Sequence, residues 1–180
     1  PSPARVGIEH DGFNPRTGEA QVRTCTDDQP FSAFIYKTIA DPFVGKLSLF
    51  RIFSGTITPS TILYNVNKDK TEKSSGLYIM RGKKQVAKQT LHAGDLGALA
   101  KLQYTSTGDT LADYNNPIQY PGMVFPTPCM HKAVYAAKQG EEDKIFSGLN
   151  RLIEEDPSIV IQKNVDTTET WPSGQGEMHL

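Results

Sequence analysis

The sequence predicts a mainly β fold with an α+β part: a small β-barrel followed by a truncated split β-α-β domain. Short apolar, aromatic and β-branched runs recur between residues 31 and 111, and turn residues separate them. A proline-rich segment follows at residues 116–128. Beyond it the pattern changes to the order strand, helix, strand, strand, which is the first part of a split β-α-β unit.

The strands of the barrel are expected where β-forming residues cluster. The expected ranges are 31–39, 47–53, 61–66, 76–80, 98–104 and a short piece at 110–111. Turn signals separate them at Asp41-Pro42, Thr58-Pro59, Asn67–Asp69, Arg81-Gly82, Ala93–Asp95 and Thr107–Asp109. Four aromatic residues are expected in the barrel core rather than on a base-stacking platform: Tyr36, Phe50, Phe53 and Tyr64. The barrel is therefore expected to span residues 30–115.

Connectors are expected on both sides of the barrel. Residues 1–29 show weak periodicity, and turn pairs such as Asp11-Gly12 leave room for a short hairpin in this linker. Residues 116–127 are expected to be an interdomain linker because they are rich in proline and contain Gly122. A hinge is expected at 117–128, since domain movements concentrate in a few loop residues.

The second domain is expected at residues 128–180. A strand is predicted at 130–136, followed by a helix at 141–155 whose apolar residues share one face. Acidic residues occupy the first turn of this helix, and Asp156-Pro157 ends it. Further strands are predicted at 159–165 and 169–171. The last residues, 174–180, read as a turn and the opening of a helix, so we expect the chain to be a piece of a larger protein.

Composition argues against several classes of protein. The chain has 180 residues, of which 37% are apolar and 22% are charged, and its formal net charge is −1. No global basic field is therefore available for strong nonspecific binding to nucleic acid. Neither a signal peptide nor a membrane span is expected, because no apolar run approaches the roughly 18 residues that a span needs. Cys25 and Cys129 are expected to be free thiols in a reducing cytosol.

Motifs for nucleotide binding and catalysis are not recognisable. Gly45-Lys46 is followed by Leu47, and Gly82-Lys83 by Lys84, so neither is a P-loop, which needs Ser or Thr there. The four histidines, His10, His92, His131 and His179, lack metal-ligand spacing. We therefore expect no catalytic residue, no metal site and no cofactor site in this chain.

One local charge feature stands out between residues 68 and 88. Seven basic residues crowd a stretch whose only acids are Asp69 and Glu72: Lys68, Lys70, Lys73, Arg81, Lys83, Lys84 and Lys88. They either protect a solvated hairpin edge against aggregation or dock on a phosphate backbone without reading its sequence. Arg51 and Lys46 are interpreted as structural charges at the barrel edge.

Several long motifs resemble bacterial elongation factor G. Those similar to its second domain are Asp41-Pro42-Phe43-Val44-Gly45-Lys46-Leu47, Phe50-Arg51-Ile52-Phe53-Ser54-Gly55-Thr56, Ala93-Gly94-Asp95 and Thr107-Gly108-Asp109-Thr110-Leu111. Those similar to its third domain are Leu149-Asn150-Arg151-Leu152, Glu154-Glu155-Asp156-Pro157-Ser158 and Gly176-Glu177-Met178-His179-Leu180. Pro1-Ser2-Pro3 is similar to the exit of the family's GTPase domain.

The resemblance implies a translation-factor β-barrel and a partial ferredoxin-like domain III, with residues 1–29 as a linker from a missing GTPase domain. It implies that the barrel docks on small-subunit ribosomal RNA and protein. Domain III would couple GTP hydrolysis to tRNA and mRNA movement. The P-loop, magnesium ligands and catalytic histidine of the family match no position here. The chain is thus expected to be a non-enzymatic part of a cytoplasmic translation elongation GTPase, with GTP and Mg²⁺ in the parent's missing domain.

Departures from the family pattern keep other interpretations open. Gln175 stands where the family usually has Met, Trp171-Pro172-Ser173 replaces a more regular strand, and 61–89 is weakly matched. One alternative is a fragment of a tetracycline-resistance-type ribosome-protection protein. Another is an independent RNA-binding barrel, and a third is an enzyme whose site lies between two domains. The partners implied by the resemblance are the ribosome and the protein's own GTPase domain, and no membrane.

Overall fold

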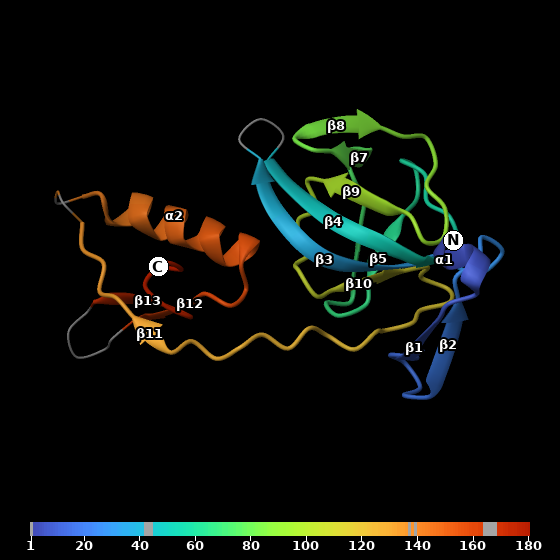
Figure 1. Cartoon of the computed structure of the whole chain (residues 1–180), viewed down its shortest axis with the longest axis horizontal. Helices are drawn as coiled ribbons and strands as arrows, with labels where there is room; N and C mark the ends of the chain where they lie inside the picture. Colours follow the sequence, from blue (N-terminus) through green and yellow to red (C-terminus); the bar gives the residue numbers. More distant parts are fainter. Residues whose placement is uncertain (1, 42–44, 137, 139, 164–168) are drawn as a thin grey trace. The chain divides into compact units, whose positions relative to one another are not determined.

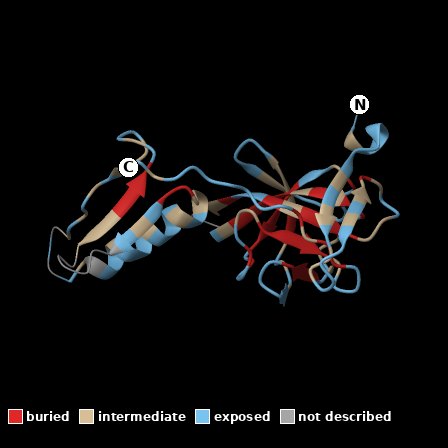
Figure 2. Ribbon diagram, turned by 90° about the horizontal axis from the view of Figure 1, so that it is seen from below, coloured by how far each residue is buried: buried red, intermediate tan, exposed pale blue. Residues whose placement is uncertain are grey.

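The computed structural model describes the chain except residues 1, 42–44, 137, 139 and 164–168 (Figure 1). The chain forms two compact units, Pro1–Gly122 and Met123–Leu180. Each is described by itself below. The division falls inside the 116–127 segment. Burial is concentrated in the strands of the first unit (Figure 2).

The first unit is built on an eight-stranded antiparallel sheet with the strand order β6-β5-β10-β3-β4-β9-β7-β8. Its strands are β3 (Ser32–Asp41), β4 (Gly45–Ser54), β5 (Leu63–Asn65), β6 (Lys70–Glu72), β7 (Leu77–Arg81), β8 (Lys84–Ala87), β9 (Leu96–Ala100) and β10 (Thr110–Ala112). A second, two-stranded sheet pairs β1 (Glu9–Phe13) with β2 (Ala20–Thr24), after the short helix α1 (Pro3–Val6). The predicted mainly β architecture is confirmed.

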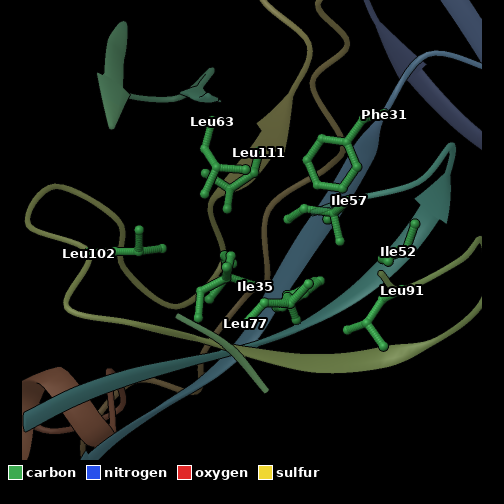
Figure 3. Packing of buried hydrophobic residues seen from close by; sticks show 12 residues of the cluster. Phe31, Ile35, Ile52, Ile57, Leu63, Leu77, Leu91, Leu102 and Leu111 are labelled. Atoms are coloured by element: carbon green, nitrogen blue, oxygen red, sulfur yellow. The ribbon is translucent and has the colours of Figure 1, made fainter. Parts of the chain in front are cut away.

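The main core lies on one face of the long strands β3 and β4. Side chains alternate along each strand, so Ile35, Phe50 and Ile52 point to this face and are 0% exposed. Leucines and isoleucines from the shorter strands and loops complete the cluster, including Leu63 and Leu111 (Figure 3). The β-branched and aromatic runs predicted as strands thus form the centre of the barrel.

A second apolar cluster covers the other face of the same strands. Ile118 and Tyr120 are buried in it, and Phe34 and Phe53 pack against it. The backbone of Gln119 pairs with Phe13 at the end of β1. Residues 117–120 are therefore part of the first unit's core, although the sequence places them in the linker 116–127. Their apolar side chains cover a sheet face that would otherwise be exposed to water.

The flanking residues 1–29 also differ from a plain linker. They contain α1 and the hairpin β1–β2, and Cys25 is completely buried. The backbone N–H of Gly55 donates to the carbonyl of Thr26 at 2.9 Å, which ties the end of this segment to the end of β4. The turn pairs that allow a short hairpin do produce one, with β1 and β2 in register from Glu9↔Thr24 to Phe13↔Ala20.

Some predicted strand limits were wrong. β6 and β8 were not predicted, because runs of only three or four residues, each beginning with a lysine, lack the apolar alternation of a strand. The strand predicted at 98–104 is β9 at Leu96–Ala100, and it ends before Lys101, whose φ of 59° is incompatible with a strand. The turn residue Pro42 lies outside the described residues.

The second unit contains β11 (Met130–His131), α2 (Glu142–Glu155), β12 (Val160–Lys163) and β13 (Thr170–Gly174). Its three-stranded antiparallel sheet has the order β11-β13-β12, so the predicted strand, helix, strand, strand order is confirmed. The strand predicted at 130–136 is shorter than expected, with one further bridge between Val134 and Thr170. β13 is longer than the strand predicted at 169–171. Residues 164 and 165, at the end of the strand predicted at 159–165, lie outside the described part.

The helix α2 ends where its sequence indicates. Asp156 has an extended backbone, with φ −133° and ψ 95°, as expected for a residue before proline. Phe146 and Leu152, both predicted on the apolar face, are 44% and 48% exposed in this chain.

Within the described residues, no helix has the length and apolar character needed to cross a membrane.

Candidate functional site

The seven predicted docking residues lie at opposite edges of the eight-stranded sheet. Lys68, Lys70 and Lys73 lie in or beside β6, whereas the other four lie in or beside the β7–β8 hairpin. β6 and β8 are the first and last strands in the sheet order. Strand pairing therefore does not gather the seven residues into one patch. They form two separate groups.

The side chain of Lys68 is bound by groups of its own domain. Its ammonium donates to the Tyr104 carbonyl at 2.5 Å and to the Ser106 hydroxyl at 2.6 Å. The same ammonium lies 3.2 Å from the Asp109 carboxylate, which is largely buried. Because these contacts occupy the donors of the ammonium, Lys68 holds a loop of its own domain.

The tip of the β7–β8 hairpin presents the densest group of exposed cations among the seven. Arg81 pairs with Lys84, and the two-residue turn Gly82-Lys83 joins them. Gly82 has a φ of 59°, the left-handed conformation that such tight hairpin turns need. Arg81, Lys83 and Lys84 are exposed at this tip. Lys88 is exposed as well, but it lies at the other end of the hairpin, where its backbone N–H donates to the Leu77 carbonyl. The cations of this tip are therefore accessible to a large anionic surface.

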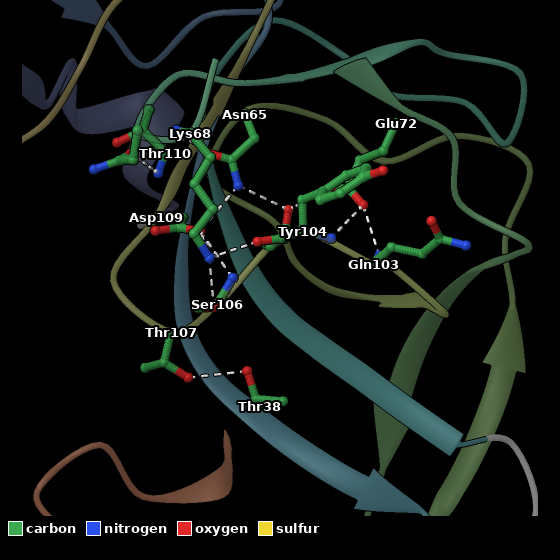
Figure 4. A network of polar contacts seen from close by, with 12 residues as sticks. Thr38, Asn65, Lys68, Glu72, Gln103, Tyr104, Ser106, Thr107, Asp109 and Thr110 are labelled. Carbon is green, nitrogen blue, oxygen red and sulfur yellow. Dashed lines mark hydrogen bonds and ion pairs between the residues drawn. The ribbon is translucent and has the colours of Figure 1, made fainter. Parts of the chain in front are cut away.

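A polar network fixes the loop 103–109 against the barrel (Figure 4). The side-chain amide of Asn65, which is 0% exposed, donates to Asp109 at 2.9 Å and to Thr105 at 3.1 Å. Glu72 accepts from the backbone N–H groups of Gln103 and Tyr104 and from the Thr105 hydroxyl. Buried polar groups with satisfied partners make a loop rigid. The loop therefore has one fixed conformation.

A chain of buried hydroxyl groups joins the second apolar cluster to β3 and β4. The Ser32 hydroxyl lies 2.6 Å from both the Tyr120 and the Ser54 hydroxyls, and Ser54 donates to the Pro30 carbonyl. Burial raises the pKa of Tyr120 to about 12. Tyr120 is thus a neutral hydrogen-bonding group that anchors residues 117–120 to the sheet.

The four aromatic residues predicted in the core have different environments. Phe50 and Tyr64 are buried, as predicted. Tyr36 is 39% exposed and Phe53 is half-buried, because both lie on the outer face of β3 and β4. For Tyr36 the prediction of a core position was wrong, whereas Phe53 packs against the second apolar cluster rather than the main core. The alternation of side chains along a strand could have shown this. Phe34 and Tyr36 point to the face opposite that of Ile35, and Phe53 points to the face opposite that of Ile52.

Charged and histidine side chains do not assemble a cluster suited to a metal ion in the described part of the chain. No cluster of three or more His, Cys, Asp or Glu residues suitable for a metal occurs there. His92 pairs with Asp27 at 2.8 Å near the end of the flanking segment. Arg51, interpreted from the sequence as a structural charge at the barrel edge, is half-buried on the central strand β4, on the same face as Phe53.

In the second unit, two motifs that are far apart in sequence meet. His179 Nε2 lies 3.0 Å from the Asp156 carboxylate, and His179 Nδ1 accepts from the backbone N–H of Gln175 at 3.0 Å. This second bond fixes the tautomer, so Nε2 carries the proton and donates it to Asp156. The backbone N–H groups of His179 and Leu180 both point to the Gly176 carbonyl, which closes one helical turn. The predicted opening of a helix is present as this turn.

The Asp156 clamp should make the second unit sensitive to acid. Hydrogen bonds, first from the Ser158 hydroxyl and then from its backbone N–H and His179, lower the pKa of Asp156. A lowered carboxyl pKa adds stability that is present above the unfolded value and is lost as the pH falls through the folded value. We expect Asp156→Asn to lower the thermal midpoint at pH 7 and to weaken the loss of stability that sets in as the pH falls below about 4.

The fluorescence of Trp171, the single tryptophan of the chain, reports on this unit and is the measurement to use. Glu154→Gln is the matched control, because Glu154 is a nearby exposed acid on α2. If Asp156→Asn and Glu154→Gln give the same thermal midpoints at pH 7 and at about pH 3, the hydrogen bonds of Asp156 with Ser158 and His179 do not stabilise the unit.

Comparisons with known proteins agree with the order of these units. The family model for elongation factor G domain 2 matches residues 30–114, and the model for elongation factor G domain III matches residues 125–180. The crystal structure of a Thermus thermophilus protein is similar to this chain, with a TM-score of 0.74 and 26% sequence identity. The similarity covers 84% of this chain and 23% of that one. The chain therefore belongs to the elongation factor G family and contains domains II and III of an elongation-factor-G-like protein.

Proposed function

We propose that this chain is the non-catalytic docking and coupling part of a ribosomal translocase. The observation that carries the proposal is the ordered match to domain II and domain III of elongation factor G over 30–114 and 125–180. GTP and Mg²⁺ would bind in another domain of the parent protein. The barrel would dock on the small ribosomal subunit, and domain III would transmit the nucleotide state to tRNA and mRNA movement.

The geometry supports a mechanism based on rigid surfaces. The loop 103–109 is held by buried hydrogen bonds, and the β7–β8 tip presents three exposed cations, Arg81, Lys83 and Lys84, at a tight turn. Contacts with a phosphate backbone need positive charge at fixed positions and no base readout. The tip meets this need. Lys68 does not, because it binds Asp109 within the barrel.

Charge reversal at the tip should slow docking. In the full-length parent protein, we expect Lys83→Glu with Lys84→Glu to reduce the association rate with ribosomes about tenfold at low salt, because steering by opposite charge is lost. The effect should shrink as salt is added. Stopped-flow light scattering at several salt concentrations measures both quantities.

The control is Lys70→Glu with Lys73→Glu, which makes the same charge change at the opposite edge of the sheet. An equal slowing by both pairs would point to net charge rather than to docking at the tip. An unchanged association rate for the Lys83 and Lys84 pair at low salt would reduce the tip to a solvated edge.

A further inference from the structure

The chain segments before and after the barrel are bonded directly to each other. The hairpin β1–β2 precedes the barrel strands in the sequence, and residues 114–121, which we call the exit segment, follow the last of them, β10. The backbone N–H of Phe13 donates to the Gln119 carbonyl at 3.0 Å, and the N–H of Gln119 donates to the Phe13 carbonyl at 2.8 Å. These two bonds form an antiparallel bridge between the hairpin and the exit segment.

Two arginines of the hairpin extend this contact along the exit segment. The Arg16 guanidinium donates to the Tyr114 carbonyl at 2.9 Å, and its Cζ lies 4.8 Å from the centre of the Tyr114 ring. The Arg23 guanidinium donates to the Asn116 carbonyl at 3.0 Å. Such charge-assisted hydrogen bonds and cation–π contacts are stronger than neutral polar contacts. The hairpin therefore contacts the exit segment from residue 114 to residue 119.

Gly12 lets the two segments approach closely. A Cβ added at Gly12 would lie 2.6 Å from the Gln119 carbonyl oxygen and 2.8 Å from the Ile118 side chain. A position at which another backbone comes this near needs glycine. β1 and the exit segment are thus packed with no room for a side chain between them at this point.

The underside of the hairpin is bonded less completely. The His10 ring stacks on Phe53 of β4 with 3.7 Å between centroids. Three buried polar atoms of the hairpin, however, have no hydrogen-bond partner among the described residues: His10 Nε2, Gln21 Oε1 and Arg23 Nε. Their side chains share one face, because His10 pairs with Arg23, and Gln21 pairs with Gly12 two positions along β1. Buried polar atoms without partners favour opening, since water would satisfy them.

The bonds that hold the exit segment on the eight-stranded sheet are few. The Tyr120 hydroxyl lies 2.6 Å from the Ser32 hydroxyl, and the Tyr120 N–H donates to the Thr110 hydroxyl at 3.2 Å. β1 and β2 pair with each other in a separate sheet, so lifting them breaks no ladder of the eight-stranded sheet. Such an opening would uncover the second apolar cluster, whereas the main core would stay buried.

We propose that the hairpin β1–β2 and the exit segment form a strap, residues 9–24 with 114–121, which opens and closes as one unit while the eight-stranded sheet stays folded. The bridge at Phe13 and the close packing at Gly12 join its two parts. The unpartnered polar atoms make its contact with the sheet the place where opening costs least free energy.

The role of the strap in the parent protein rests on the proposed coupling function. A displacement of the residues before β1 would pass through the strap to the residues after Tyr120 without passing through the eight-stranded sheet. Coupling between two sites needs an element with two arrangements that both sites bias. The strap is such an element, and it contacts the chain on both sides of the barrel.

Native-state hydrogen exchange of the full 180-residue chain, followed by NMR at several urea concentrations, tests the strap without ribosome or nucleotide. Amides of β1, β2 and residues 118–120 should share one opening free energy and one shallow urea dependence, both smaller than those of β4 and β9. Tyr120→Phe removes only the hydroxyl that bonds to Ser32. We expect it to accelerate exchange about fivefold, by the same factor in the hairpin as in residues 118–120.

Tyr104→Phe is the matched control, because it removes the same atom from an exposed tyrosine of the same unit that lies outside the strap. It should leave exchange in the strap unchanged. The proposal is overturned if Tyr120→Phe accelerates residues 118–120 but not β1 and β2, since the hairpin then opens by itself. It is also overturned if the strap amides have the opening free energy and urea dependence of β4. Either result leaves ribosome docking standing, because the association rates of the charge-reversal variants test docking separately.

Discussion

Gly55→Ala should destabilise the first unit by about 2–5 kcal/mol, through two separate effects. The first is the backbone: Gly55 has a φ of 72°, which costs an L-residue about 1–2 kcal/mol. The second is crowding, because an added Cβ would lie 2.7 Å from the Gln29 carbonyl oxygen and 2.7 Å from the backbone of Phe31. Backbone atoms cannot rotate away as a flexible side chain can, and overpacking costs about 1–3 kcal/mol.

Gly18→Ala separates the two effects. Gly18 has a similar φ of 75°, yet an added Cβ would meet no atom within 4 Å. Only the backbone cost of about 1–2 kcal/mol should remain. Urea denaturation followed by circular dichroism measures both variants, and Trp171 fluorescence checks that the second unit is unaffected. Equal destabilisation by the two variants would mean that the region around Gly55 can relax and that crowding is absent.

Asn65→Ala should destabilise the first unit by about 2–4 kcal/mol. The side chain is 0% exposed, donates to Asp109 and Thr105, and accepts from the backbone N–H of Lys68. Alanine leaves these groups buried without their partner, and unsatisfied buried groups cost more than the net value of a hydrogen bond. The amide protons of the loop 103–109 should also exchange faster with solvent, because the network that holds the loop is broken.

Asn115→Ala is the matched control for this second prediction. Asn115 is exposed, so its removal should change the free energy of unfolding by less than about 0.5 kcal/mol. Hydrogen exchange measured by mass spectrometry resolves the loop from the rest of the barrel. If exchange at 103–109 is the same in Asn65→Ala and in the parent chain, the polar network is not what fixes the loop.

The parts of the fold that were predictable have a strong local signal. β3 and β4 are long and rich in β-branched and aromatic residues, and α2 has a regular apolar face with acids in its first turn. β6 and β8 lack such a signal, since they form by pairing with β5 and β7 and carry mostly polar residues. Their existence depends on long-range contacts.

The candidate surfaces were predictable only in part. The seven basic residues are visible as a local run, but only the sheet order separates the β7–β8 tip from the group at β6. Lys68 could not be assigned from sequence, because its partner Asp109 is 41 residues away. The stacking of His10 on Phe53 could not be predicted either. His10 and Phe53 are brought together only when the hairpin β1–β2 packs on the outer face of the sheet.

The two cysteines of the chain differ in a way that has a practical consequence. Cys25 is completely buried in the first unit, and burial raises the pKa of its thiol, whereas Cys129 is exposed near the start of the second unit. A maleimide dye needs an accessible thiolate. The unaltered chain therefore offers Cys129 as a single attachment point for a dye. Cys129 lies eight residues after Pro121, close to the segment between the domains, so the dye suits fluorescence measurements of how the two domains reorient.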